Sequence, residues 1–310
     1  DYDGRYLLSA SYRTDGSSRF APDTRWGDFY SVGLGWRISG EKFMEGIKKT
    51  VNELKLRGSY GEQGNENIGL LYTYNDYYFA NGVGGYTPPN PSRVANKELQ
   101  WETNSVLNLG MDFGLLNNRI TGTVEWFKRK SANLLFDVPL PISTGFAQVY
   151  QNIGAMQNTG VELQLGIAAI RRADFRWRVD FNVTSFKNKI TKLPPNQAKN
   201  GIISGTKKLI EGGGIFDFWL PEFAGVDAST GDALYYVDIK DSTGKIVDTE
   251  ITNRYSVASG SLRNMGSALP KFAGGITNSF SFKGFDLSVL TTFSYGGKFY
   301  DGNYASIMHR

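Results

Sequence analysis

The sequence predicts an all-β protein whose antiparallel strands form part of a transmembrane β-barrel. Two observations predict this fold: about nine segments alternate apolar with polar or small residues, and the connections between them alternate between long and short. Strict alternation places one kind of side chain on each face of a strand. Outer-membrane barrels have long extracellular loops and short periplasmic turns, whereas a soluble sandwich has no reason for this rhythm.

The alternating segments are mostly close to the length of 9–11 residues that a tilted membrane-crossing strand requires. In one of them, Val32, Leu34 and Trp36 alternate with glycine and arginine. Each segment has one apolar face and one face that is mostly polar or small. The strands are expected at 6–13, 32–38, 54–60, 107–113, 120–126, 161–167, 175–183, 272–282 and 287–295.

The connections discriminate between barrel and sandwich better than the strands do, because a small soluble barrel would show the same alternation. Asn117-Asn118 and Lys283-Gly284 are expected to form tight turns, since Asn and Gly tolerate positive φ. In chain order we expect connections that are long at 13–28, moderate at 39–53, long at 62–100, short at 115–118, long at 131–157, short at 171–173, very long at 189–269 and short at 283–284.

The composition excludes several classes of function. The chain has 310 residues with 37 Gly, 17 Tyr and 20 Phe, but no Cys and one His. Without Cys there are no disulfides, thiolate metal sites or thiol nucleophiles. The single His309 makes histidine-based catalysis improbable, and no cofactor is expected. The net charge of +4 is small and dispersed, so no nucleic-acid partner is expected.

Glycine-rich and acidic segments are weak candidates for ligand sites. The glycine clusters at 61–64, 82–85 and 212–214 lack the spacing of a phosphate-binding loop, and flexible loops are the expected interpretation. The acidic segments 227–232 and 238–244 lack the alternating ligands of a calcium loop, so turns are favoured over a metal site. We expect no catalytic residues and no metal ligands, and therefore no enzyme.

The two ends of the sequence suggest a longer protein. No signal peptide precedes Asp1, and no closing strand leads into Arg310. We expect residues 1–310 to be unable to close a barrel alone, because the first and last strands would expose unpaired edges.

Many segments in this order resemble the barrel of SusC/RagA-type TonB-dependent transporters. Clear examples are YLLSASYRTDGSSRF at 6–20, LQWET at 99–103, NTGVEL at 158–163 and LPKF at 269–272. The further segments that carry the resemblance are 25–27, 31–38, 54–61, 138–141, 145–146, 151–154, 285–290 and 294–297. The resemblance spans nearly the whole chain.

The resemblance implies a barrel of about 22 strands with a plugged lumen, of which this chain supplies less than half. It also implies active import of oligosaccharides or peptides through the outer membrane of a Gram-negative bacterium. The implied partners are a SusD-like surface lipoprotein, outer-membrane lipid and the TonB-ExbB-ExbD complex, which would act through a plug outside this sequence. Two alternatives stay open: a passive porin, and a soluble β-sandwich or lectin-like binding module.

Aromatic residues in two long connections are the candidates for contacts with cargo or with the lipoprotein lid. A tyrosine offers a flat apolar face and a hydroxyl, which suits stacking on sugars or peptide groups as well as packing within the loop. We expect the first group to face the cell exterior. The candidates are Tyr72, Tyr74, Tyr77, Tyr78, Phe79 and Tyr86 in the first connection, and Phe218 and Trp219 in the second.

Overall fold

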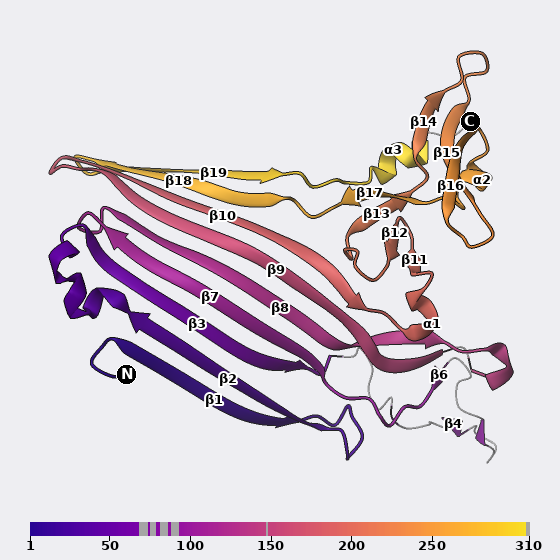
Figure 1. Ribbon diagram of the computed structural model, residues 1–310, viewed down its shortest axis with the longest axis horizontal. Coiled ribbons are helices and arrows are strands. Elements are labelled where there is room, and N and C mark those ends of the chain that lie inside the picture. Colours follow the sequence, from indigo (N-terminus) through magenta and orange to yellow (C-terminus); the bar gives the residue numbers. More distant parts are fainter. Residues whose placement is uncertain (68–73, 75–78, 81–85, 88–92, 147, 308–310) are drawn as a thin grey trace.

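The computed structural model describes residues 1–67, 74, 79–80, 86–87, 93–146 and 148–307. Its main feature is an antiparallel sheet of long strands that pair in the order of the sequence (Figure 1). These are the nine strands that alternation predicts: β1 (Tyr6–Gly16), β2 (Trp26–Arg37), β3 (Val51–Asn65), β7 (Glu102–Leu115), β8 (Ile120–Pro139), β9 (Gln148–Arg171), β10 (Phe175–Lys192), β18 (Phe272–Phe282) and β19 (Phe285–Tyr295). A short strand, β6 (Arg93–Val94), pairs in parallel with β9.

The register keeps apolar residues of neighbouring strands opposite one another on one face of this sheet. Leu8 of β1 lies opposite Leu34 of β2, and Phe280 of β18 lies opposite Leu287 of β19. These side chains are poorly covered, since Leu8 is 67% exposed and Leu34 and Leu287 are each 60% exposed. An apolar face of this extent indicates a surface that contacts something other than water.

The short connections lie together at one end of the sheet, at the left of Figure 1. In the four-residue connection 116–119 between β7 and β8, Leu116, Asn117 and Asn118 have φ angles of 53°, 54° and 55°. Lys283 and Gly284, between β18 and β19, have φ angles of 47° and 88°. Two-residue hairpin turns of type I′ require positive φ at both central residues, which Asn and Gly adopt with little strain. The tight turn predicted at Lys283-Gly284 is therefore confirmed as a two-residue turn. Asn117 and Asn118 lie within a longer turn, in which the N–H of Arg119 donates a hydrogen bond of 2.9 Å to the carbonyl of Leu115.

Two of the predicted connection lengths are wrong. The connection between β1 and β2 covers only 17–25, whereas that between β2 and β3 covers 38–50 and includes the 3-10 helices η1 (Ile38–Gly40) and η2 (Lys42–Ile47). The connection between β8 and β9 is reduced to 140–147, with η3 (Ile142–Thr144), because both strands continue past 131–157. Register shifts between Ser131 and Leu135 interrupt the alternation there. A bulge of this kind hides the strand from a test of strict period two.

The connection between β10 and β18 folds into two small sheets at the other end of the main sheet (Figure 1). The first contains β11 (Ile202–Ser204), β12 (Lys207–Leu209), β13 (Asp217–Leu220) and β17 (Arg263–Ser267). The second contains β14 (Phe223–Val226), β15 (Ala233–Lys240) and β16 (Ile246–Thr252). The α-helices are α1 (Pro195–Ala198), α2 (Tyr255–Ala258) and α3 (Gly302–Ile307). Within the described residues, no helix has the length and apolar character needed to cross a membrane.

A small aromatic core ties the long-connection ends of β2 and β7 together, although β3 separates these strands in the sheet. Phe20 and Leu99 are fully buried. The ring centroid of Trp101 lies 5.6 Å from those of both Phe20 and Phe29. The indole N–H of Trp101 donates a hydrogen bond of 2.9 Å to the carbonyl of Arg25. A buried indole usually needs such a partner, so this contact fixes how the connection 17–25 packs.

The main sheet is open at both edges. Within the described residues, β1 pairs in the sheet only with β2, and β19 pairs only with β18. An unpaired strand edge is a template for a further strand. The arrangement agrees with the expectation that residues 1–310 form an unclosed part of a barrel.

Candidate functional site

The face opposite the apolar one carries a cluster of charged side chains on β3, β7 and β8. The register sets Lys55 opposite Asp112, and it sets Gly110 between Arg57 and Glu125. Because Gly110 has no side chain, Arg57 reaches across it, and its Nη2 lies 2.5 Å from Oε2 of Glu125. The Nε atom of Arg57 lies 3.4 Å from Oδ2 of Asp112. One arginine thus bridges carboxylates from two neighbouring strands.

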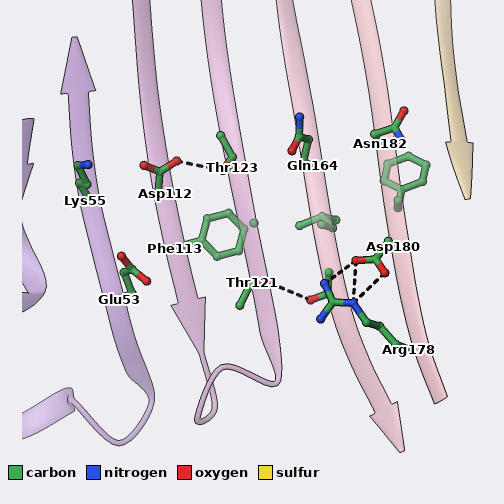
Figure 2. A pocket seen from close by; sticks show the side chains of 14 residues that line it. Glu53, Lys55, Asp112, Phe113, Thr121, Thr123, Gln164, Arg178, Asp180 and Asn182 are labelled. Carbon is green, nitrogen blue, oxygen red and sulfur yellow. Dashed lines mark hydrogen bonds and ion pairs between the residues drawn. The ribbon is translucent and has the colours of Figure 1, made fainter. Parts of the chain in front are cut away.

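A cavity of about 580 Å³ opens beside this cluster, and Figure 2 shows the side chains that line it. In this cavity, Arg178 and Asp180 of β10 form a second ion pair, with Nη2 and Oδ1 2.5 Å apart. The hydroxyl of Thr123 donates a hydrogen bond of 2.9 Å to Asp112. Both signs of charge therefore meet in one polar hollow. Its other polar walls are Glu53, Lys55, Thr121, Gln164 and Asn182.

The ion pairs of this face are too open to water to hold the fold. Arg57 keeps 33% of its side-chain surface exposed, and Glu125 keeps 20%. An ion pair at such exposure contributes about 0–1 kcal/mol. Within the part of the chain that the structure describes, no group of three His, Cys, Asp or Glu side chains is arranged to hold a metal ion. The face therefore offers fixed charges and hydrogen-bonding groups to a solute or to another polypeptide segment.

The first group of aromatic candidates lies mostly beyond what the structure describes. Tyr72, Tyr77 and Tyr78 fall outside the described residues, whereas Tyr74 is described and half-buried. The backbones of Phe79 and Tyr86 belong to β4 (Phe79–Ala80) and β5 (Tyr86–Thr87), which pair as a two-stranded sheet. The connection that contains them joins β3 to β7 at the end of the sheet opposite the short turns (Figure 1). Their role as contact residues stays a prediction.

The second pair of candidates, Phe218 and Trp219, are neighbours in β13 but have different surroundings. Phe218 of β13 is only 9% exposed, in the position of a residue that packs the small sheet. Trp219 lines a second cavity of about 950 Å³, and the ammonium of Lys208 lies 5.3 Å from its ring centroid. Successive side chains of a strand face opposite sides. The register shifts between Phe218 and Trp219, and Trp219 is half-buried at the edge of the cavity. Contacts by either residue stay a prediction.

Sequence reasoning missed the charged residues of the polar face. With 30 acidic residues in the chain, no single carboxylate stands out until the strands are paired. The signal available was the alternation itself, because Lys55 and Arg57 share the face opposite Leu54 and Leu56. What the sequence does not give is the register that brings Glu125 across Gly110 to Arg57.

Turns form within the acidic segments at 228–230 and 242–244, as the sequence favoured, whereas 238–240 belong to β15. Oδ1 of Asp227 accepts hydrogen bonds from the hydroxyl and the N–H of Ser229, at 2.6 and 2.8 Å. Oδ1 of Asp241 accepts the same pair from Thr243, at 2.6 and 2.9 Å. These hydrogen bonds favour the charged form and therefore lower the pKa of both carboxyl groups. The bond from the hydroxyl has the largest effect, and the bonds from backbone N–H groups add to it. Each carboxylate thus stabilises its own loop.

A family model described as TonB-dependent receptor-like β-barrel matches residues 1–306. The chain belongs to this family, and its main sheet is part of such a barrel. The resemblance to SusC/RagA-type transporters, recognised from the sequence, is confirmed by individual relatives. The TonB-dependent receptor SusC of Bacteroides thetaiotaomicron is 32% identical over 296 residues, which cover 92% of this chain and 29% of the relative.

Two further comparisons give the same picture. TonB-dependent receptor P39 of Formosa agariphila is 31% identical over 339 residues, covering 97% of this chain and 32% of the relative. The solved structure of the RagAB peptide importer in its open-open state aligns with a TM-score of 0.83 and 30% identity, covering 95% of this chain and 31% of that one. The chain thus spans about a third of the length of these relatives.

Proposed function

We propose that this chain is part of the barrel of an outer-membrane importer in a Gram-negative bacterium. The importer takes up oligosaccharides or peptides, is energised through the TonB-ExbB-ExbD complex and works with a SusD-like surface lipoprotein. The observation that carries the proposal is the division of one continuous sheet of the TonB-dependent receptor family into an apolar and a polar face. This division is what a barrel needs when lipid lies outside and water or protein lies inside.

The apolar face has the dimensions and composition that contact with lipid requires. Every long strand has 11 or more residues, and about 9–11 residues suffice to cross a bilayer at a tilt. Trp36 is 38% exposed at one end of β2, and Trp26 is 66% exposed at the other. Aromatic side chains at both ends of a spanning strand are typical of the girdles at membrane interfaces.

Residues 1–310 supply one part of the barrel domain in this proposal. We place a plug and an N-terminal extension in other segments of the same protein, which is compatible with the chain's coverage of only 29–32% of its relatives. The charged cluster around Arg57 and the hollow beside Asp180 face the lumen, where they contact the plug or passing cargo. The long connections, including that of Tyr72 to Tyr86, face the cell exterior and the lipoprotein.

Uptake measured with the whole protein in its native membrane tests this function. Fluorescent maltohexaose and a fluorescent pentapeptide pool serve as probes, each with and without an intact TonB protein. The proposal expects uptake of at least one probe that stops when TonB is deleted, and co-purification of a surface lipoprotein with the barrel. Uptake that continues at the parental rate without TonB would establish a passive porin instead. A whole protein found in the soluble fraction would favour the binding-module alternative.

A further inference from the structure

Strand β10 continues beyond the strand that pairs with one of its edges. Its pairing with β18 ends where Thr184 lies opposite Ala273, whereas its pairing with β9 continues to Lys192. The main-chain groups of this edge are next bonded at Ile190, whose N–H and C=O bond to Gly213 and Gly212 at 2.8 Å each, and the side chain of Asn188 accepts a hydrogen bond of 2.9 Å from the N–H of Ile215. Within the described residues, the stretch 185–189 therefore has a strand partner on one side only.

The main chain of this stretch directs hydrogen-bonding groups into the gap. In an antiparallel ladder, alternate residues direct both their N–H and C=O to the same neighbour. Ile190 directs its groups away from β9, and the register with β9 is regular from Ser185 to Ile190. Phe186 and Asn188, which have the same parity as Ile190, therefore present their N–H and C=O groups to the gap.

The gap opens into the second cavity, of about 950 Å³, which is lined by Trp219. Two of its walls are runs of consecutive residues, 185–188 and 210–214. Consecutive residues line a cavity together where their main chain is accessible. The second run includes Gly212, where a Cβ atom would meet only the Lys189 side chain, at 3.9 Å, so that another chain can approach closely. The volume lies within the range of about 300–1,000 Å³ that is usual for ligand sites.

The cavity has this shape because the segment before β18 turns away from β10. The hydroxyl of Ser185 donates a hydrogen bond of 2.6 Å to the carbonyl of Lys271, which marks the last contact. The preceding residue is Pro270, which also lines the cavity. Proline has no N–H and cannot continue a ladder. The sequence therefore fixes the open space between residues 185–188 of β10 and the segment that ends at Lys271, which we call the wedge.

The acidic and basic side chains around the wedge differ in whether they have partners within the protein. Glu211 accepts a hydrogen bond of 2.8 Å from the N–H of Leu193, and Asp217 accepts one of 3.0 Å from the N–H of Gly214. Both carboxylates thus hold the walls. Lys187 and Lys271 also line the cavity and are exposed, and within the described residues neither forms an ion pair. Among the described residues, the two ammonium groups are therefore the charged groups of the cavity without a protein partner, whereas Glu211 and Asp217 keep their negative charge in its walls.

We propose that this wedge binds an extended, carboxylate-bearing peptide by strand addition to the free edge of β10. The inference rests on the proposed function and names the cargo of the importer. A free edge with regularly spaced N–H and C=O groups pairs with an extended peptide, whereas a sugar chain does not repeat that pattern. The stretch 185–189 is about 17 Å long at roughly 3.3 Å per residue, so it accommodates a peptide of about five residues. The ammonium groups of Lys187 and Lys271 meet its carboxylates.

Backbone methylation of the ligand tests the strand pairing directly. The probe is a pool of pentapeptides that contain Asp and a free carboxyl terminus, titrated against the full-length transporter in detergent by calorimetry. The best binder is then remade with a single N-methyl group at each position in turn. Strand addition expects a loss of affinity of tenfold or more at alternate positions and less than threefold at the positions between them. Equal effects at all positions, or no effect at any, would overturn the proposal.

Matched tryptophan variants test the location. Lys187→Trp places a large ring in the wedge, whereas Lys189→Trp changes an exposed lysine on the same face of β10 that does not line the cavity. We expect peptide affinity to fall at least tenfold in the first variant and to stay within twofold in the second. Parental affinity in Lys187→Trp would overturn the location.

The uptake assay separates the two proposals. TonB-dependent uptake of maltohexaose by a transporter that binds no peptide would overturn the peptide inference and leave the importer standing. Uptake that does not depend on TonB would overturn the importer itself.

Discussion

The main sheet and the small sheet β14–β16 are both antiparallel, yet they are held together differently. In the main sheet the charged cluster around Arg57 lies on one face, with Arg57 at 33% exposure, and large apolar side chains of the other face are exposed. In the small sheet, Asp238 of β15 pairs with Arg263, which reaches over from β17 of the neighbouring sheet and also pairs with Glu222; the side chain of Asp238 is only 8% exposed. The same alternation therefore serves two purposes, because the two sheets meet different surroundings.

The difference teaches where each region is vulnerable. The main sheet depends on its ladders of backbone hydrogen bonds and on an apolar medium outside, so it tolerates changes on the polar face. The small sheet projects from the end of the main sheet (Figure 1), and the ring of Tyr235 packs against those of Phe223 and Tyr255. The guanidinium of Arg263 also lies 5.2 Å from the ring centroid of Tyr236. The order of the small sheet is therefore expected to depend on the ion pairs of Arg263 together with these aromatic contacts.

A charge on the apolar face is expected to have the largest effect. Val32 lies in the middle of β2 with 42% exposure, and Val32→Arg should cost about 2–4 kcal/mol if that face meets lipid. Urea unfolding of the full-length protein in vesicles measures this cost. Ser59→Arg on the polar face is the matched control and should change stability by less than about 0.5 kcal/mol. Equal costs for the two variants would contradict the assignment of the faces.

Loss of the ion pairs of Arg263 should loosen the small sheet and leave the main sheet intact. Arg263→Met leaves the buried Asp238 without its ion-pair partner. We expect the local free energy of unfolding to fall by about 1–3 kcal/mol. Hydrogen exchange of the amides in β15 and β16 measures it. Arg254→Met is the control, since Arg254 is exposed and forms no ion pair within the described residues. Faster exchange in β8 or β9 as well would mean that the two regions are not independent.

Alternation in the sequence was enough to predict all nine long strands, because each predicted segment keeps an apolar environment on one face and a polar environment on the other. It failed where those surroundings change. The extensions of β8 and β9 leave the regular pattern at the register shifts after Ser131, and the predicted loop 131–157 was wrong for this reason. The strands of the connection 193–271 are short, so a period of two has too few residues in which to appear.

The candidate site was less predictable than the strands, since its residues come together only through the register of the paired strands. Tyr and Trp residues stand out in a sequence by type alone, and they were chosen on that basis. Arg57 and Glu125 acquire their relation only through the register of three strands across Gly110. The wedge beside β10 likewise exists because β18 stops pairing at Thr184, and no local pattern marks that point.

The connection between β2 and β3 should respond to pH through Glu41. Its carboxylate accepts hydrogen bonds from the hydroxyl of Tyr6 at 2.7 Å and the indole of Trp36 at 3.0 Å, and it pairs with Arg5 at 2.9 Å. These contacts lower the pKa of Glu41, led by the bond from Tyr6. The stability they add is therefore fully present above the unfolded pKa of about 4.3 and is lost as pH falls through the lower folded value.

Fluorescence of the full-length protein reports this transition, because Trp36 contacts the titrating group. A shift in the emission of Trp36 is expected below about pH 4.3. The shift should be absent in Glu41→Gln, whose side chain does not titrate. The same titration in Asp227→Asn should match that of the parent, since Asp227 lies in the turn between β14 and β15. An unchanged transition in Glu41→Gln would show that another group is responsible.

The smallest effect is expected on the polar face of the main sheet, at Gly110. A Cβ atom added there would lie 2.7 Å from Cζ of Arg57, and the guanidinium, as the end of a flexible side chain, would move away from Glu125. Gly110→Ala should then cost no more than about 1 kcal/mol, which is the value of an exposed ion pair. A double-mutant cycle with Arg57→Met measures this by urea unfolding. If the alanine acts only by displacing Arg57, its effect disappears in the Arg57→Met background, whereas an equal cost in both backgrounds would mean that the strand itself is strained.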